Sequence, residues 1–317
     1  MTLFVEGFAC LGSFGTGAQC LADAVRAGRT ESFTQLADIS RLSDFFPARA
    51  LRQCDRFSRL ALLGACLAAE DAGLSHTGTD NCGVVLATGY GSAVPTFDFL
   101  DSILEHGEQM ASPLAFSLSV HNIPAAIVSK TLRVQGPCAT VCQFESAAAS
   151  GLMLASQWLY GGRVDRVIFG AVDEYTELLA SVTRRLARLR EAEGTGEGRR
   201  SLPLGEGAAF FILSREEKKS VGRITAVSLQ SGPSCREKTA PDDCPCFLSG
   251  ATSFEARNRP GVFDGSKVYG NIPVAAALDC AAALVMLQKE DAAFSRCRCR
   301  NYGPYVCSEI VIEKTRP

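Results

Sequence analysis

The chain has 317 residues, of which 47% are hydrophobic and 21% are charged, and its formal net charge is -2. A chain of this length and composition folds as a soluble globular protein with one extended core or two fused halves. So small a net charge provides no electrostatic field for binding nucleic acid or an anionic lipid surface.

No membrane-spanning helix is expected, because the longest apolar segment, 272–287, is interrupted by Pro273 and Asp279. Residues 1–8 contain Glu6 and no leading lysine or arginine, which is typical of a first strand and not of a signal peptide. We therefore expect a cytoplasmic protein without membrane or nucleic-acid partners.

Short β-runs alternate along the chain with amphipathic or small-residue segments, which indicates an α/β fold with helices packed on sheets. One helix is expected over 55–72, where apolar residues recur with a helical period and Gly73 provides a stop. The expected strands are 3–8, 82–88, 138–144, 166–169, 208–213, 222–230 and 307–313.

Two further segments, 146–160 and 272–287, are apolar almost all round and rich in Ala, Gly and Ser. Helices of this kind are buried and closely approached by their neighbours. Each half of the chain also ends in a β-run, so we expect a duplicated architecture. The predicted halves are 1–195 and a shorter 196–317, joined within the Gly-rich and charged loop 191–200.

Fourteen cysteines raise the question of metal binding or disulfides. The close pairs Cys244/Cys246 and Cys297/Cys299 have C-x-C spacing, whereas common zinc sites have C-x-x-C spacing. Without a secretory signal, we expect reduced thiols that pack as small core residues. No metal site and no cofactor are predicted.

The most informative segment is 136–149, Gly-Pro-Cys-Ala-Thr-Val-Cys-Gln-Phe-Glu-Ser-Ala-Ala-Ala. A Gly-Pro pair and a β-run lead into a small-residue helix, and the carboxylate of Glu145 stands at the turn. This segment resembles the active-site segment of the β-ketoacyl synthases of the thiolase superfamily, in which a nucleophilic cysteine opens the helix. Glu145 occupies the position of that cysteine.

The resemblance extends over nearly the whole chain. Each further match is short, but the order and spacing of the matches agree with the family. The matching segments are 55–57 (Asp-Arg-Phe), 69–74, 83–89, 112–113, 119–125 and 204–209. The resemblance implies a thiolase-like α/β fold of duplicated αβαβα layered halves with two central buried helices.

In active family members the cysteine takes an acyl chain from a carrier protein, and two histidines assist the decarboxylation of a malonyl unit. By this resemblance, Gly250 stands at the first histidine position and Asn271 at the second. The family lysine falls on Ser266, with Lys267 one position away. Glycine donates no side-chain hydrogen bond and asparagine carries no proton, so we do not expect condensation by this chain alone.

The three histidines offer no replacement for the missing pair. His76 and His106 lie in polar surroundings typical of solvated side chains, and His121 is expected to be structural more often than catalytic. At 302–306, a proline and bulky residues stand where the family has a flexible glycine gate, which predicts a fixed wall.

Glu145 has two open interpretations. The partial positive charge of a helix N-terminus stabilises a carboxylate, so Glu145 can be a capping or buried anchor residue. Alternatively, it can bind an amine or hydroxyl donor, or act as a base if burial raises its pKa.

The leading hypothesis is a catalytically silent ketosynthase-like subunit, similar to the chain-length factors that pair with an active ketosynthase in polyketide or fatty-acid-type synthesis. By that resemblance, the strand 138–144, which precedes the turn at Glu145, forms the dimer contact, and both subunits line the acyl tunnel. The implied tunnel and dimer positions are Met110, Ala111, Leu114, Phe116, Cys138, Thr140, Cys142 and Phe144. Ordinary core packing is the alternative interpretation of each tunnel position.

Two other hypotheses stay open. One is an enzyme with altered chemistry, in which Glu145 serves a hydrolase, decarboxylase or acyltransferase acting on carrier-bound acyl thioesters. The other is a homodimeric protein that binds an acyl chain without converting it. A basic run that includes Arg184 and Arg185 is a candidate contact for an acidic acyl carrier protein with its phosphopantetheine-linked substrate; a solvated helix face is the commoner explanation.

Overall fold

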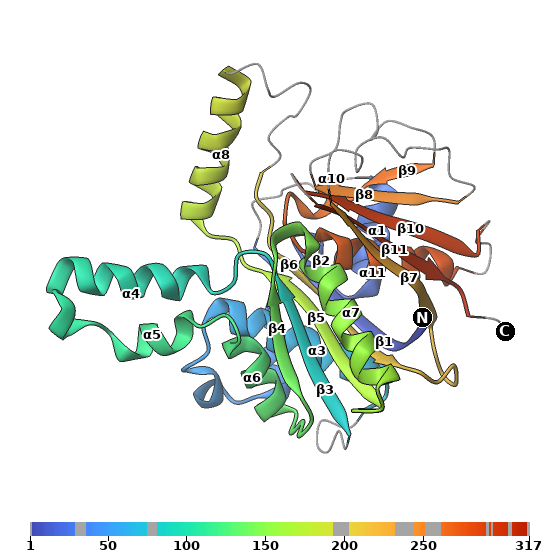
Figure 1. Cartoon of the computed structure of the whole chain (residues 1–317), viewed down its shortest axis with the longest axis horizontal. Helices are drawn as coiled ribbons and strands as arrows, with labels where there is room; N and C mark the ends of the chain where they lie inside the picture. The colour runs from blue at the N-terminus through green and yellow to red at the C-terminus, as the bar shows by residue number, and fades with distance from the viewer. Residues whose placement is uncertain are drawn as a thin grey trace.

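The computed structural model describes residues 2–28, 36–74, 81–192, 203–231, 244–250, 261–289, 292, 294–303 and 306–315. Its strands are β1 (Leu3–Gly12), β2 (Gly15–Thr16), β3 (Cys82–Thr88), β4 (Cys138–Cys142), β5 (Arg166–Asp173), β6 (Gly207–Ser214), β7 (Gly222–Ser231), β8 (Cys246–Gly250), β9 (Val262–Asp264), β10 (Arg296–Tyr302) and β11 (Val306–Glu313). The expected α/β class is confirmed (Figure 1).

The α-helices are α1 (Ala18–Ala27), α2 (Leu42–Phe45), α3 (Arg56–Asp71), α4 (Ala93–His106), α5 (Pro113–Ser119), α6 (Ile123–Thr131), α7 (Ala147–Tyr160), α8 (Glu177–Ala192), α10 (Ser266–Tyr269) and α11 (Ala275–Leu287). The described residues also include the short 3-10 turns η1 (Ala48–Leu51), η2 (Glu108–Met110) and η3 (Phe144–Ser146). None of the described helices is long and apolar enough to cross a membrane.

The strands form one continuous sheet, and the strand order read from either outer edge to the centre is the same. The path is β4-β3-β5-β6-β1-β7-β11-β10-β8-β9, with β2 attached to β1. Leaving out β2, the strands β1, β3, β4, β5 and β6 form one set of five and β7 to β11 form another. In each set, numbered in chain order, the strands run third, second, fourth, fifth, first from the outer edge of the sheet to its centre. The third–second and second–fourth pairs are parallel and the others antiparallel in both halves. The same topology therefore occurs twice in the chain.

We call β4, β3, β5, β6 and β1 the first half-sheet, and β7, β11, β10, β8 and β9 the second. Strand β6 pairs with β1 and β5, so it belongs to the first half-sheet. The boundary predicted between 195 and 196 lies outside the described residues and stays a prediction, whereas the change from one half-sheet to the other lies between Ser214 and Gly222.

Helices α7 and α11 form a layer between the two half-sheets. Helix α7 packs on β3, β4 and β5 and also contacts β7 and β11, while α11 packs on β8, β10 and β11 and also contacts β6 and β1. Both helices lie in one hydrophobic cluster with inward residues of both half-sheets. These are the two small-residue helices expected from the sequence, and their small side chains permit the close approach.

Helix α3 covers the other face of the first half-sheet, together with α6. Asp55 caps its N-terminus, because the Oδ1 atom accepts a hydrogen bond of 2.9 Å from the Ser58 N–H. A Cβ atom on Gly64 would enter the ring of Phe210 on β6, so only glycine allows this helix to lie so close to the sheet.

The outer face of the second half-sheet carries ion pairs. Within the described ranges no helix packs on this face, so the outer helical layer expected for the second half is not seen there. Arg296, Arg298 and Arg300 project from β10 on the side opposite the buried Cys297 and Cys299. They pair with Glu309 and Glu313 of β11.

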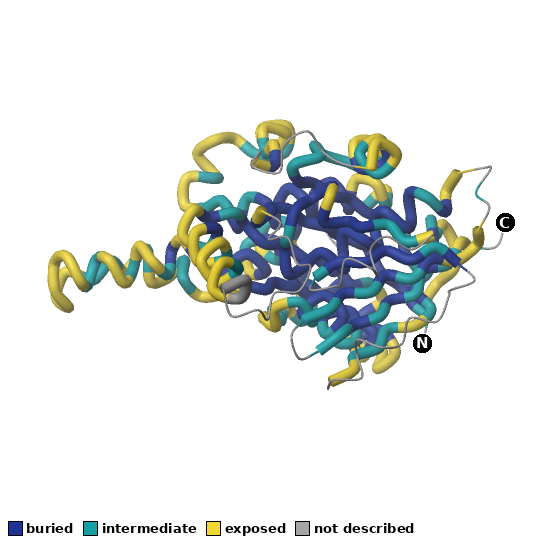
Figure 2. The backbone as a smooth tube through the Cα atoms, turned by 90° about the horizontal axis from the view of Figure 1, so that it is seen from above, coloured by how far each residue is buried: buried dark blue, intermediate teal, exposed yellow. Residues whose placement is uncertain are grey.

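Three helices project from the body. Helices α4 and α5 form a hairpin at one end of the molecule, and α8 stands beside it (Figure 1). Seen from above, the projecting hairpin is largely exposed, whereas buried backbone fills the centre of the molecule (Figure 2). Large exposed apolar side chains lie on these helices, namely Val94, Phe97, Leu100, Leu104, Leu114, Phe116, Leu178, Val182, Leu186 and Leu189.

Candidate functional site

The turn from β4 into α7 forms a strained elbow. Strand β4 ends at Cys142, two residues earlier than expected, and η3 leads into α7. Phe144 has a φ of +44°, a left-handed conformation that is uncommon for a bulky residue. Backbone strain of this kind tends to occur at functional sites. The next residue, Glu145, is therefore displayed at the tip of the elbow and is half-buried.

Glu145 lies between Tyr90 and the turn that joins β10 to β11. A Cβ atom on Gly303 of that turn would lie 3.2 Å from the Glu145 Oε2 atom. Burial raises the pKa of Tyr90 to about 12, and the charges of Asp173 and Glu145 add to this effect. The ring of Tyr90 also packs edge-on against Phe144, with centroids 6.2 Å apart. Of the segment 302–306, which is predicted to form a fixed wall, residues 304 and 305 lie outside the described part of the chain.

Asn301 joins the elbow to the second half of the chain. It lies on β10, and its side chain is 1% exposed. Its Nδ2 atom donates to the main-chain oxygen of Glu145 at 3.2 Å and to that of Pro273 at 3.1 Å. One side-chain amide therefore connects the elbow before α7 with the segment before α11.

Gly250, at the first predicted histidine position, lies directly against Asn301. Its φ is +76°, a conformation that favours glycine. A Cβ atom there would stand well inside van der Waals contact with the Asn301 Oδ1 atom and the main-chain oxygen of Tyr302. The space that a histidine side chain would need is already occupied. Residues 251–254, the rest of that motif, lie outside the described part of the chain.

Asn271, at the second predicted histidine position, is half-buried. Its main-chain N–H donates to the Pro203 oxygen at 2.9 Å, and its oxygen accepts from the Gly205 N–H at 3.2 Å. Glu145 and Gly250 thus lie directly against Asn301, whereas Asn271 is two residues before Pro273, whose main-chain oxygen accepts from Asn301. Ser266 is buried on α10, where its N–H donates to Asp264 at 3.2 Å, whereas Lys267 is exposed.

Asp173, at the end of β5, fixes the turn that follows β3 and leads to Tyr90. Its carboxylate accepts hydrogen bonds from the Thr88 hydroxyl at 2.7 Å and from the N–H groups of Gly89 and Tyr90 at 3.0 and 3.1 Å. Burial raises the pKa of Asp173 to about 6, although these hydrogen bonds oppose the shift. Neither Asp173 nor Asn301 is among the residues predicted from the sequence. For Asp173, the available signal was an aspartate at the end of a buried strand.

The predicted tunnel and dimer positions are mostly on the surface. Met110, Leu114 and Phe116 are 66%, 57% and 56% exposed, so core packing within this chain does not account for them. Ala111 and Thr140 are half-buried, and Cys138, Cys142 and Phe144 are exposed. Among the described strands, β4 is the outer edge of the first half-sheet, and an edge strand can pair with a strand of another chain.

The predicted carrier-protein contact lies on a projecting helix. Arg184 and Arg185 are exposed on α8, and Arg184 forms an ion pair with Glu177. Over the described ranges, no group of three or more His, Cys, Asp or Glu side chains is arranged to hold a metal ion.

Both histidines in the described ranges, His106 and His121, are exposed. His121 is exposed, and its Nδ1 atom accepts a hydrogen bond of 3.3 Å from the Ser92 N–H. His106 is exposed at the end of α4. His76 lies outside the described residues.

Comparisons with known proteins show the same overall fold. Solved structures share the thiolase-like fold: the ishigamide ketosynthase/chain length factor superposes with a TM-score of 0.78 at 18% identity, covering 100% of both chains. A beta-ketoacyl synthase from Burkholderia phymatum gives a TM-score of 0.72 at 15% identity over 99% of both chains. A type II polyketide synthase acyl-carrier protein in complex with its ketosynthase gives 0.72 at 12% identity and the same coverage.

Sequence relatives point the same way. A putative polyketide beta-ketoacyl synthase 1 from Streptomyces halstedii is 28% identical over 191 residues, which are 53% of this chain and 45% of that protein. A 3-oxoacyl-[acyl-carrier-protein] synthase 2 from Staphylococcus aureus is 24% identical over 56% of this chain and 46% of that protein. The matches thus span less than half the length of these relatives. The family model "Beta-ketoacyl synthase, N-terminal domain" matches residues 18–219, and the chain belongs to the β-ketoacyl synthase family.

Proposed function

We propose that this chain is a catalytically silent ketosynthase-like subunit, which pairs with an active ketosynthase and shapes the acyl tunnel in polyketide or fatty-acid-type synthesis. The observation that carries the proposal is the packing at Gly250. A backbone oxygen and the Asn301 amide fill the place of the first histidine side chain. The first histidine is therefore not only replaced by glycine; the path of the backbone also leaves no room for a side chain at that position.

The other two positions support the same conclusion. A carboxylate such as that of Glu145 is a poor nucleophile toward a thioester, and its negative charge opposes the enolate that condensation forms. Asn271 can donate a hydrogen bond but cannot transfer a proton. All three groups that would carry condensation are thus replaced by groups that cannot perform it.

The surface supports pairing with another subunit. Strand β4 is an open sheet edge with the exposed Phe144 beyond its end, and the α4–α5 hairpin bears exposed apolar side chains. Exposed apolar patches and open edges of this kind mark protein–protein contacts. The ketosynthase/chain length factor among the similar folds supports an active ketosynthase as the partner class, and the ketosynthase solved with its acyl-carrier protein supports a carrier protein as visitor.

Co-expression with an active ketosynthase from the same organism, followed by native mass spectrometry, tests the pairing. We expect a one-to-one heterodimer, which Leu114→Asp/Phe116→Asp on α5 would disrupt. The control Leu36→Asp/Phe294→Asp changes side chains that are also exposed, at 46% and 48%, but lie elsewhere, and should leave the heterodimer intact. A chain that forms only homodimers would instead favour an acyl-binding protein.

One observation favours a second candidate, an enzyme with altered chemistry. The Glu145 carboxylate is only half-buried at the elbow and lies close enough to Tyr90 to affect its pKa. An accessible carboxylate can act as a base in hydrolysis, decarboxylation or acyl transfer of a carrier-bound thioester. Under this candidate the purified chain turns over such a thioester and Glu145→Gln abolishes the turnover; a chain without turnover eliminates it.

A further inference from the structure

A polar cluster of two buried and two half-buried residues lies where the projecting helices join the body. We call Asp55, Arg56, Glu174 and Glu206 the root cluster. Asp55 and Arg56 stand at the start of α3, and Glu206 precedes β6. Glu174 follows β5 and leads into α8. The cluster therefore lies where the body meets the segment that carries α8.

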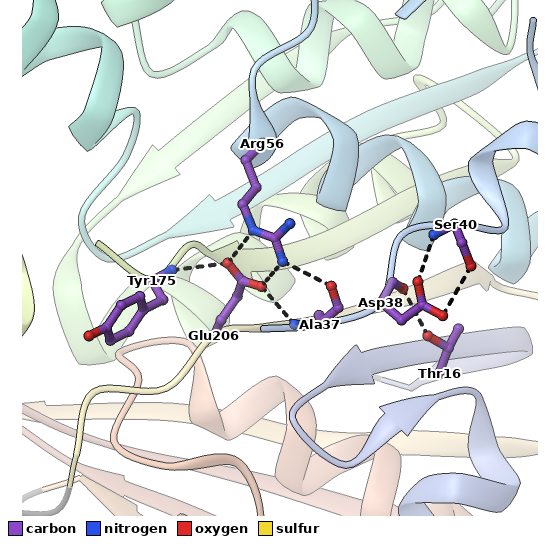
Figure 3. Close-up of polar contacts among 7 residues, drawn as sticks. All are labelled: Thr16, Ala37, Asp38, Ser40, Arg56, Tyr175 and Glu206. Atoms are coloured by element: carbon purple, nitrogen blue, oxygen red, sulfur yellow. Dashed lines mark hydrogen bonds and ion pairs between the residues drawn. The ribbon is translucent and has the colours of Figure 1, made fainter. Parts of the chain in front are cut away.

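Glu206 is fully occupied by hydrogen-bond donors (Figure 3). Its side chain is 1% exposed and is held by both Arg56 Nε, at 2.8 Å, and Arg56 Nη2. The Ala37 N–H donates to its Oε1 atom at 2.9 Å, and the Tyr175 N–H donates to its Oε2 atom at 3.2 Å. The guanidinium of Arg56 thus holds Glu206 through two nitrogens, and its Nη2 atom also donates to the Ala37 main-chain oxygen at 2.9 Å.

Glu174 has much weaker support. It is 3% exposed, and its Oε1 atom accepts a long hydrogen bond of 3.4 Å from the N–H of Val94, in the first turn of α4. It therefore touches the root of α4 as well as that of α8. Among the described residues, no other hydrogen-bond donor to this carboxyl group is found.

Asp55 presents an unused acceptor in the same cluster. Its Oδ1 atom caps α3, while its Oδ2 atom is buried and has no hydrogen-bond partner among the described residues. Burial raises the pKa of Glu174 to about 7, and the charge of Asp55 adds to the rise. Glu206 also raises this pKa, whereas the Val94 N–H and Arg56 lower it. Arg56 hydrogen-bonds Glu206 and the Ala37 main-chain oxygen, so it offsets the negative charge around Glu174 only in part.

We propose that Glu174 is a proton-dependent latch, which in its protonated form donates a hydrogen bond to the unused Asp55 oxygen and holds the roots of α4 and α8 against α3. In its ionised form, Glu174 is repelled by Asp55 and Glu206, and the connection between β5 and α8 loosens. The helices held in this way carry the exposed apolar side chains of the α4–α5 hairpin and α8. The latch therefore controls how rigidly that surface is presented.

The direction of the pH dependence follows from the raised pKa. Glu174 binds its proton more tightly in the latched form than in an open form, where its pKa returns to about 4.5. The latched form therefore loses stability as the pH rises from about 4.5 to about 7, and changes no further above that value. Within this window, a one-proton latch changes the opening equilibrium by up to about tenfold per pH unit.

Amide hydrogen exchange of the full chain between pH 5 and pH 8, corrected for intrinsic exchange rates, tests the latch without any partner protein. We expect protection in the first turns of α4 and α8 to fall with rising pH until about pH 7 and then to level off. Glu174→Gln should remove this fall, whereas Glu177→Gln, at an exposed position of the same segment, should retain it.

Asp55→Asn provides a second variant, because asparagine still caps α3 but removes the charge that faces Glu174. It should flatten the pH dependence in the same two regions. If both Glu174→Gln and Asp55→Asn retain the fall of the unmodified chain, the latch is wrong. That outcome would leave the proposed silent subunit untouched, because the latter rests on Gly250 and Glu145.

Discussion

Asn301 donates a hydrogen bond of 3.2 Å from its side-chain amide to the main-chain oxygen of Glu145. The same amide holds the Pro273 oxygen at 3.1 Å, so one buried side chain connects the elbow of the first half with the start of α11 in the second. It also lies in the space that a side chain at position 250 would need. The side chain that holds the elbow through its Nδ2 atom thus also obstructs a side chain at position 250 through its Oδ1 atom.

Asn301→Ala should destabilise the fold by about 2–4 kcal/mol, because it leaves two main-chain oxygens without their donor in a buried place. Urea unfolding monitored by circular dichroism measures the change. Asn301→Asp keeps the shape but removes both N–H donors, so it should cost at least as much. A loss below about 0.5 kcal/mol for the alanine variant would contradict the bridging role.

Gly250→Ala should cost roughly 3 kcal/mol or more, since the added Cβ meets both the Asn301 side chain and the Tyr302 backbone. Gly261→Ala is a matched control, because Gly261 has a similar φ of +79° but nothing within 4 Å of the added atom. The control should cost only about 1 kcal/mol from its backbone conformation. Equal losses for the two variants would show that position 250 is not sterically closed.

Glu145→Cys combined with Asn271→His should not restore condensation on malonyl-loaded carrier protein. The cysteine and the second histidine position are then present, but the first histidine position stays closed at Gly250. The assay follows release of carbon dioxide and formation of the ketoacyl product, with an active ketosynthase as the positive control. Product formation by this variant would show that the first histidine position is dispensable.

Asp279 predicts a pH dependence of folding stability. It is completely buried on α11, where its Oδ1 atom accepts a hydrogen bond from the Tyr269 hydroxyl, and burial raises its pKa well above 3.8. The folded state therefore binds the proton more tightly than the unfolded state, and this contribution to stability is lost as the pH rises.

Asp279→Asn should accordingly gain stability relative to the unmodified chain as the pH is raised from about 5 to about 9, measured by urea unfolding at each pH. The exposed Asp23→Asn on α1 serves as the control and should follow the unmodified chain. Parallel pH profiles for the unmodified chain and the Asp279→Asn variant would contradict a proton held at this position.

Arg184→Glu/Arg185→Glu should weaken binding of an acidic acyl carrier protein by about three- to tenfold, because rim charges contribute modestly to affinity. Isothermal titration calorimetry at low salt measures the effect. Arg49→Glu/Arg52→Glu changes the net charge equally at exposed positions on another surface and should have little effect. Unchanged affinity for the α8 variant would remove this helix from the carrier contact.

The strands of the first half were predictable because β3, β5 and β6 are buried on both faces and read as continuous apolar runs. Strand β10 was not predicted, because its alternating Arg and Cys residues were interpreted as a C-x-C cysteine pair and not as the alternating pattern of a strand. The structure explains that pair by strand periodicity, since Cys297 and Cys299 face α11 while the arginines form ion pairs on the other face.

Asn301 follows the same periodicity as Cys297 and Cys299 and therefore points inward. Recognising β10 would have predicted this direction, but the contact with Glu145 crosses 156 residues of sequence and depends on how the two halves pack. The family positions of Glu145, Gly250 and Asn271 came from motif spacing alone. The obstruction at Gly250 came from the structure, because it depends on a backbone conformation that spacing does not encode.

The most direct test of the silent-subunit account is a condensation assay on malonyl-loaded carrier protein with this chain alone, an active ketosynthase alone, and the two purified together. The account predicts turnover only for the pair, no turnover by this chain alone, and an unchanged chemical step when the Glu145→Ala variant replaces the native chain in the pair. Turnover by this chain alone, abolished by Glu145→Ala, would make Glu145 a catalyst and contradict the account.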